Sequence, residues 1–213
     1  MSKPRGKTFE RIVRESLALF NEHGERNVTT NHIAAHLGIS PGNLYYHFRN
    51  KEEIVYQIFC QYRDCLTERL AMPVDRALTA ADLGAFLDTA FDVMWRYRFL
   101  FHDQPGLLAR NPQLQQDYLE FVNSTFRALL FGHFREFVRL GLLRIDDADI
   151  EPVMLNIWLV VKFWFAFEEA AHPHDRSGAA YSRRGVRQVL TLLKPYVQPD
   201  FQPVFNALLE RTA

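Results

Sequence analysis

The side chains best suited to binding chemistry lie between residues 40 and 51, where polar and aromatic groups follow a serine and a proline. Asn43 has a donor and an acceptor side by side, so it can pair with an adenine edge in the major groove. The ring methylenes of Pro41 can meet a thymine methyl group, and Gly42 has no side chain to hold a ligand away from the backbone. A helix beginning after Ser40 would direct free N–H groups toward a phosphate. The spacing predicts a helix that lies against duplex DNA.

Longer side chains in the same stretch suit the DNA backbone. Tyr45, His47 and Lys51 can reach phosphates, and such contacts set register and orientation without reading sequence. An alternative is that Tyr45, Tyr46 and Phe48 are core aromatics. We accept core packing for Phe48, but two adjacent tyrosines on one helix cannot both point inward.

The elements that must position these groups are two short helices around a tight turn. Thr29 or Thr30 is a plausible N-cap of the first helix, which has an apolar stripe, and Gly38 ends this helix in the left-handed conformation. Ser40 and Pro41 begin the second helix at its N-cap and N1 positions. Asn50 is the predicted cap of a third helix, with a glutamate at N3 that can complete a capping box. This order is typical of a helix-turn-helix.

The same stretch resembles the DNA-binding signature of the tetracycline-repressor (TetR) family. The matching residues are Thr30, Ile33, Ala34, Gly38, Ile39, Ser40, Gly42, Leu44, Tyr45, His47, Phe48 and Lys51. The match covers residues 10–60, and the rest of the chain agrees in length and helical character alone. The resemblance implies a transcriptional regulator that is dimeric and responds to a ligand. A repressor is the first expectation, and an enzyme is not expected.

The resemblance also implies roles for single residues. Thr30, Tyr45, His47 and Lys51 match phosphate-contact positions, and Asn31, Pro41, Asn43 and Tyr46 match base-facing positions. Together with Ser40 and Gly42 these residues form the predicted DNA-binding set. The sequence has Asn31 where some relatives carry a longer basic residue.

Charge is unevenly spread along the 213 residues, although the formal net charge is zero. Residues 1–51 hold eight Lys and Arg against four Glu, an excess of four positive charges that the remaining residues offset. A basic front segment suggests a polyanion partner, although such an excess is also common without one. Lys3, Arg5 and Lys7 form a short basic arm that can touch phosphates or simply fray.

Cysteine usage and hydropathy indicate a cytoplasmic protein without a membrane partner. Cys60 and Cys65 are five apart in one predicted helix and face different sides, so a disulfide between them is not expected. Unpaired cysteines fit a reducing compartment, and the first residues lack the apolar segment of a signal peptide. The most apolar run, 153–167, is shorter than the about 20 residues of a membrane span and is predicted to be a buried helix.

No stretch alternates with period two, so the predicted fold is all-α, with about nine to ten helices. We expect a three-helix head carrying the helix-turn-helix in residues 1–52 and a larger helical ligand-binding and dimerisation domain in residues 53–213. Outside the helix-turn-helix, helices are predicted at 8–23, 51–70, 80–101, 113–140, 150–171, 179–194 and 200–211. The segment 150–194 holds more apolar surface than one packing face needs, which marks an interface. The resemblance implies a two-fold dimer through a four-helix bundle.

Aromatic density in the second domain could line a cavity for an apolar or aromatic effector of unknown identity. The candidate lining residues are Phe91, Trp95, Phe99, Phe126, Trp158, Lys162 and Phe163. Core packing is the alternative for each aromatic residue. Lys162 lies in an apolar run, where a buried ammonium is costly without a partner, so it either reaches solvent or pairs with a carboxylate of a ligand or second subunit.

Catalytic and metal chemistry have weaker support. His32 and His36 have a chelating i, i+4 spacing without a third ligand, and His172, His174 and Asp175 share a polar loop. A phosphate-binding glycine loop and a nucleophile elbow are absent from the sequence. We therefore predict no catalytic residue, metal or cofactor. The alternative functions are an all-α enzyme or carrier using the aromatic cavity, and a dimerising interaction module that binds no DNA.

Overall fold

The computed structural model describes residues 6–172 and 177–212, which form two compact units. The first unit comprises residues 1–64 and 97–119, and the second comprises residues 65–96 and 120–213. Within the described ranges the secondary structure is helical, apart from one isolated bridge between Leu143 and Val197. The predicted all-α class is therefore confirmed. The predicted domain boundary after residue 52 stays a prediction. Lys3 and Arg5 of the basic arm, and His174 and Asp175 of the polar loop, lie outside the described residues.

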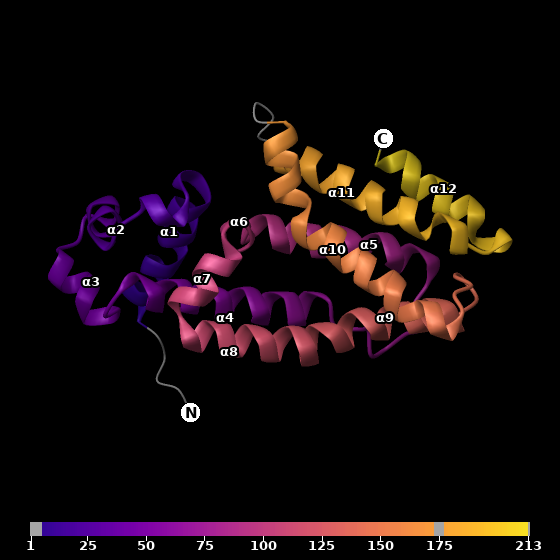
Figure 1. The fold of residues 1–213 in the computed structure, drawn as a ribbon, viewed down its shortest axis with the longest axis horizontal. Helices are drawn as coiled ribbons and strands as arrows, with labels where there is room; N and C mark the ends of the chain where they lie inside the picture. The colour runs from indigo at the N-terminus through magenta and orange to yellow at the C-terminus, as the bar shows by residue number, and fades with distance from the viewer. Residues whose placement is uncertain (1–5, 173–176, 213) are drawn as a thin grey trace. The chain divides into compact units, whose positions relative to one another are not determined.

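The front of the first unit is a helical head. Its elements are α1 (Lys7–His23), η1 (Glu25–Asn27), α2 (Thr30–Leu37) and α3 (Pro41–His47), which lie together in Figure 1. Ile12, Val13 and Phe20 of α1 are buried, at the three- and four-residue spacing of an amphipathic helix. Gly24 ends α1 with a positive φ of 79°, a conformation that costs glycine little.

The rest of the first unit is built from residues 51–64 of α4 (Lys51–Arg69) with α6 (Phe99–His102), α7 (Gln104–Arg110) and most of α8 (Pro112–Phe121). Tyr62 of α4 is buried, and its ring lies 5.7 Å from Tyr97 and 5.5 Å from Phe101. The Tyr56 hydroxyl donates to the carboxylate of Asp117 at 2.6 Å. The hydrogen bond between Tyr56 and Asp117 ties α4 to α8, because a phenol and a carboxylate make a strong charge-assisted hydrogen bond.

The second unit holds the remaining helices. They are α5 (Ala80–Arg96), η2 (Val122–Phe126), α9 (Arg127–Arg139), α10 (Asp147–Ala171), α11 (Gly178–Leu193), η3 (Lys194–Tyr196), η4 (Pro199–Phe201) and α12 (Gln202–Arg211). Glycine allows α11 to lie close to its neighbours: a Cβ at Gly185 would fall 2.2 Å from the Phe91 ring and 2.7 Å from Trp164. The Trp164 indole N–H donates to the Tyr181 carbonyl at 2.8 Å. Buried Glu168 of α10 accepts from Arg184 of α11 at 2.9 Å.

Two predicted helices are interrupted in the structure. The helix expected over 80–101 ends at Arg96, and α6 begins at Phe99. The Asn21 side chain accepts the Phe99 N–H at 3.2 Å, so this donor is satisfied from outside the helix. The helix expected over 113–140 contains η2, a π-helical turn, where the Ser124 hydroxyl donates to the Glu120 carbonyl at 2.5 Å.

Helix α10 is apolar but not fully buried. By length and composition alone it could cross a membrane, a test that core helices also pass, and 39% of its most apolar window is buried. One face carries buried residues such as Val153, Ile157 and Val161, whereas Leu159 and Phe163 are exposed. The prediction of a buried helix is therefore right for only one of its faces.

Candidate DNA-binding surface

The turn between α2 and α3 is fixed by local hydrogen bonds that the sequence predicts. The Thr29 hydroxyl accepts the His32 N–H at 3.2 Å and caps α2. Gly38 ends α2 in the left-handed conformation, with a φ of 64°. The Ser40 hydroxyl accepts the Asn43 N–H at 3.1 Å, and Pro41 occupies the first turn of α3. Helix α3 therefore begins at a defined residue.

The next cap differs slightly from the prediction. The Asn50 side chain accepts the Glu53 N–H at 2.9 Å, as expected for an N-cap. The Glu53 carboxylate, however, accepts the Arg49 N–H at 2.8 Å instead of the Asn50 N–H of a capping box. The bond still holds the connection between α3 and α4, one residue earlier than expected.

Helix α3 separates a buried side from an exposed side. Leu44 and Phe48 are almost fully buried, and the Phe48 ring stacks on Phe9 with centroids 4.6 Å apart. Tyr45 is 49% exposed and Tyr46 is 84% exposed. Burial of an 84% exposed tyrosine by a partner would remove a large aromatic surface from water. The core alternative therefore holds for Phe48 and not for the two tyrosines.

The remaining predicted contact residues lie at the surface of α2 and α3. Exposed residues of this set are Asn31, Ser40, Pro41, Gly42 and Asn43, while Thr30 and His47 are half-buried. The hydroxyls of Thr30 and Tyr45 lie 3.1 Å apart, so two predicted phosphate-contact groups from different helices come together. Their role on DNA stays a prediction, as do the roles of the other residues in the set.

Lys51 occupies a different environment from the other predicted phosphate contacts. Its ammonium lies 2.8 Å from the Glu25 carboxylate and donates to the Glu25 carbonyl at 2.8 Å, and its side chain is 20% exposed. A phosphate would have to compete with Glu25 for this ammonium. By contrast the Arg49 side chain is 90% exposed beside α3. Sequence reasoning overlooked Arg49, although a basic residue directly after the buried Phe48 was a usable signal.

The histidines of α2 have partners within the head. His36 lies 3.4 Å from the Glu15 carboxylate, and His32 accepts the Thr29 N–H through its ring. Arg14 and His36 hold the pKa of the Glu15 carboxyl below its usual value. Across residues 6–172 and 177–212, no group of three metal-binding side chains occurs.

Comparison with known proteins identifies the family. Residues 12–58 match the model of the bacterial regulatory proteins of the tetR family, and residues 61–205 match a second TetR model described as bacterial transcriptional repressor. The chain belongs to the TetR family. It is a DNA-binding transcriptional regulator of the ligand-responsive repressor type, and it is not an enzyme.

Relatives of this TetR-family regulator cover most of its length. The HTH-type transcriptional repressor KstR2 of Rhodococcus jostii is 32% identical over 154 residues, which are 68% of this chain and 74% of that protein. A TetR-family transcriptional regulator from Marinobacter aquaeolei VT8 has a crystal structure with 42% identity and a TM-score of 0.89, covering 97% and 99% of the two chains. KstR2 of Mycobacterium tuberculosis, at 22% identity and a TM-score of 0.66, shares the fold over 91% of this chain and 97% of its own.

The predicted effector residues of the regulator do not form one cluster. Phe126 and Trp158 come together, with ring centroids 4.3 Å apart, and both line a pocket of 270 Å³. Phe91 and Trp95 pack against α11 near Gly185 and Gly178.

The other three members of the set lie elsewhere. Phe99 belongs to the first unit, where its ring meets Phe20 at 5.1 Å. Phe163 is 54% exposed. Lys162 is half-buried with its ammonium 5.2 Å from the Phe163 ring, and burial lowers the pKa of this ammonium. An effector role for any of the seven stays a prediction.

Gly42 offers a test of how closely the backbone of α3 approaches DNA. A Cβ at this position would have the Ser40 hydroxyl as its nearest contact, at 4.0 Å, so alanine fits the free protein. We expect Gly42→Ala to raise the free energy of unfolding by up to about 1 kcal/mol, because alanine favours helix over glycine. We also expect DNA affinity to fall by about tenfold as the methyl group meets the groove. Thermal unfolding and fluorescence anisotropy measure the two effects, and unchanged affinity would contradict a close approach.

Proposed function

We propose that this regulator binds a palindromic DNA operator as a homodimer and is released by a small effector bound in the second unit. The observation that carries the DNA-binding surface is α3 itself: capped at Ser40, anchored by Leu44 and Phe48, and exposing Asn43 and Tyr46. A short helix with this exposed face fits the major groove, where base edges can be distinguished. Binding to chromosomal DNA supports a cytoplasmic location.

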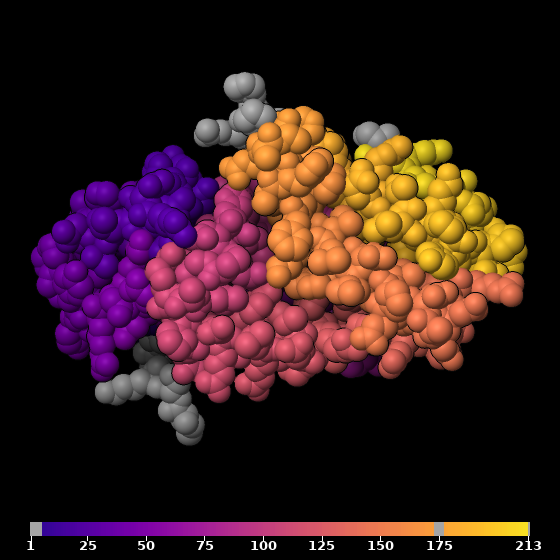
Figure 2. Space-filling model, viewed as in Figure 1, coloured from indigo at the N-terminus to yellow at the C-terminus, as the bar shows by residue number. Residues whose placement is uncertain are grey.

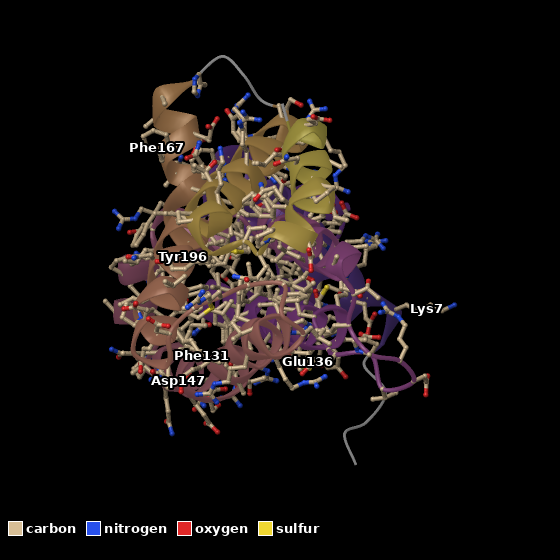
Figure 3. The ribbon with its side chains drawn as sticks, turned by 90° about the vertical axis from the view of Figure 1, so that its right-hand side faces the viewer. Lys7, Phe131, Glu136, Asp147, Phe167 and Tyr196 are labelled. Carbon is tan, nitrogen blue, oxygen red and sulfur yellow. The ribbon has the colours of Figure 1, made fainter. Side chains whose placement is uncertain are left out.

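The second support is an exposed apolar stripe along α10. Leu155, Leu159, Phe163 and Phe167 recur every four residues and are 44–59% exposed, so they lie along one face of the helix. Phe167 is at the outer edge of α10 in Figure 3, and α10 is open at the surface in Figure 2. A contiguous stripe of this kind marks an interface. We propose that the same stripe of a second chain covers it, within residues 150–194.

The effector would act by favouring one of two arrangements of the heads in the dimer. It can shift DNA affinity only by the ratio of its affinities for the two arrangements. The predicted effector is small and apolar or aromatic. A pocket of 270 Å³ that Phe126 and Trp158 both line offers space for such an effector.

Sequencing of genomic fragments retained by the purified protein tests the proposal. We expect enrichment of one palindromic sequence. In the Asn43→Ala variant, preference at one position of each half-site should relax by about 1–3 kcal/mol. Asn206→Ala, an exposed amide of α12, is the matched control and should leave the preference unchanged. Retention of random fragments would contradict sequence-specific binding, and retention of none would contradict the proposal and favour an interaction module.

A further inference from the structure

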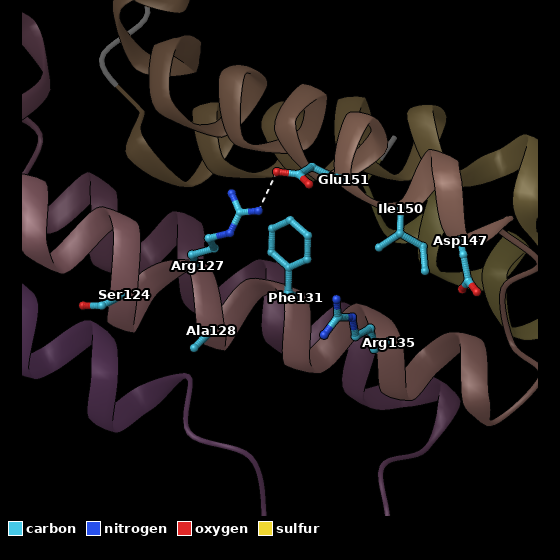
Figure 4. Close-up of a pocket in the computed structure, with 8 residues that line it drawn as sticks. All are labelled: Ser124, Arg127, Ala128, Phe131, Arg135, Asp147, Ile150 and Glu151. Carbon is cyan, nitrogen blue, oxygen red and sulfur yellow. Dashed lines mark hydrogen bonds and ion pairs between the residues drawn. The ribbon is translucent and has the colours of Figure 1, made fainter.

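A pocket of 560 Å³ opens between α9 and α10 of the second unit (Figure 4). Its lining residues are Ser124, Arg127, Ala128, Phe131, Arg135, Asp147, Ile150 and Glu151. The volume falls within the range of about 300–1,000 Å³ found for small-molecule sites. None of the aromatic residues predicted for effector binding lines this pocket, so it is a new candidate.

The wall of the pocket presents an aromatic ring between two guanidinium groups. Arg127 lies 4.6 Å and Arg135 lies 5.8 Å from the centre of the Phe131 ring, on either side of it in Figure 4. Arg127 is also paired with Glu151 at 2.5 Å. Within the described part of the chain, Arg135 has the Phe131 ring as its contact and no ion pair. Arg135 therefore keeps its hydrogen-bond donors available.

The two carboxylates of the pocket balance the two guanidinium groups in formal charge, but neither forms an ion pair with Arg135. Glu151 is already neutralised by Arg127. Asp147 is in the first turn of α10, where the helix dipole favours a negative charge. Because a guanidinium presents a planar set of donors, Arg135 suits a carboxylate, sulfonate or phosphate group.

A smaller apolar pocket, called the slot below, adjoins the larger pocket that contains Arg135. The slot is the 270 Å³ pocket lined by Phe126 and Trp158, and it shares Arg127, Phe131 and Glu151 with the larger pocket. Its further apolar lining comes from Val122, Leu130, Met154 and Leu155. A cavity of about 150 Å³ holds a benzene ring, so the slot has room for a body of about two fused rings.

The wall of the slot includes a backbone irregularity. Val122, Asn123 and Phe126 of the π-helical turn η2 line it. Single π-helical turns within α-helices are rare and frequently occur at functional sites. Phe126 of this turn contacts Trp158, and the two rings together form an aromatic wall of the slot.

We propose that the joined pockets bind an amphipathic organic anion, with its apolar body against the Phe126 and Trp158 rings and its anionic group on Arg135. This inference rests on the proposed function in one respect: the anion is the effector. It deepens the sequence prediction of an apolar or aromatic ligand by adding a negative charge and a residue that receives it.

A pair of dyes with the same apolar rings tests the proposal on the full chain. 8-Anilinonaphthalene-1-sulfonate carries an anionic group, and N-phenyl-1-naphthylamine is its neutral counterpart. We expect Arg135→Gln to raise the dissociation constant of the sulfonate by about tenfold, because a charge-assisted hydrogen bond is lost, and that of the neutral dye by less than twofold. Trp158→Leu should weaken both dyes. The matched control is Arg139→Gln, one turn further along α9, where the arginine is 67% exposed and paired with Glu136; it should change neither.

Each other outcome would overturn the inference. Equal effects of Arg135→Gln and Arg139→Gln would show that the sulfonate does not use the pocket. Equal loss of both dyes in Arg135→Gln would show that charge plays no part. If the protein binds its operator but the dyes do not behave as expected, the inference is contradicted and the proposed function is not. If the dyes behave as expected but the protein binds no duplex, the proposed function is contradicted and the anion site remains.

Discussion

Glu25→Gln is expected to lower the free energy of unfolding by about 2–3 kcal/mol. The Glu25 side chain is 8% exposed, and its carboxylate lies 2.8 Å from both Lys51 and Arg110. Breaking a buried ion pair by removing one partner costs about 3–5 kcal/mol. Lys51 and Arg110 keep 20% and 37% exposure, so water recovers part of that cost.

Urea denaturation followed by circular dichroism measures this effect. The matched control is Glu22→Gln, one turn away in the sequence and 69% exposed, which should change stability by less than about 0.5 kcal/mol. Equal stability of the two variants would contradict the claim that Glu25 holds the head to α7 through Arg110.

The double variant Leu159→Glu, Phe163→Glu should convert the dimer into monomers. Two carboxylates on the exposed stripe of α10 would have to be desolvated against the partner's stripe, which costs several kcal/mol per ion. Two linked heads gain about 10²–10⁴ in affinity over one head. We therefore expect operator affinity to fall by about 100-fold or more.

Light scattering after size-exclusion chromatography gives the mass of the variant. Val74→Glu is the control, since Val74 is 93% exposed in the segment between α4 and α5 and lies outside the stripe. It should remain a dimer with unchanged affinity. A double variant that keeps the mass of a dimer would contradict the proposal that α10 forms the subunit interface.

The helix-turn-helix could be predicted in detail because its determinants are contiguous. Thr29, Gly38 and Ser40 act on backbone groups within four residues of themselves, so the sequence alone contains the caps and the turn. Exposure of Tyr46 and burial of Leu44 follow from the same short helix.

Features that depend on distant residues could not be predicted. Glu25 meets Arg110 from 85 positions away, and this contact changes the surroundings of Lys51, which the sequence presents as a free cation. Asn21 accepts the Phe99 N–H across 78 positions and so interrupts a helix whose own pattern continues. Local periodicity carries no information about such partners.

The roles of the aromatic residues in the second unit could not be predicted from the sequence either. Helical spacing cannot tell a ring that lines a pocket from one that fills a core. Phe126 and Trp158 form a pocket wall because η2 and α10 lie side by side. Phe91 is covered because Gly185 lets α11 approach it. The charged pocket at Arg135 could not be predicted from the sequence, since its residues are spread over η2, α9 and α10.

The salt dependence of DNA affinity tests the central claim most directly. Fluorescence anisotropy with a labelled duplex carrying the selected operator should show an affinity that falls by about 100-fold or more between 50 and 200 mM salt, linearly in a double-logarithmic plot. Arg49→Gln, at the exposed end of the recognition segment, should make the slope shallower by about one unit per head. An affinity that does not change with salt, or no binding to the duplex at low salt, would contradict the account.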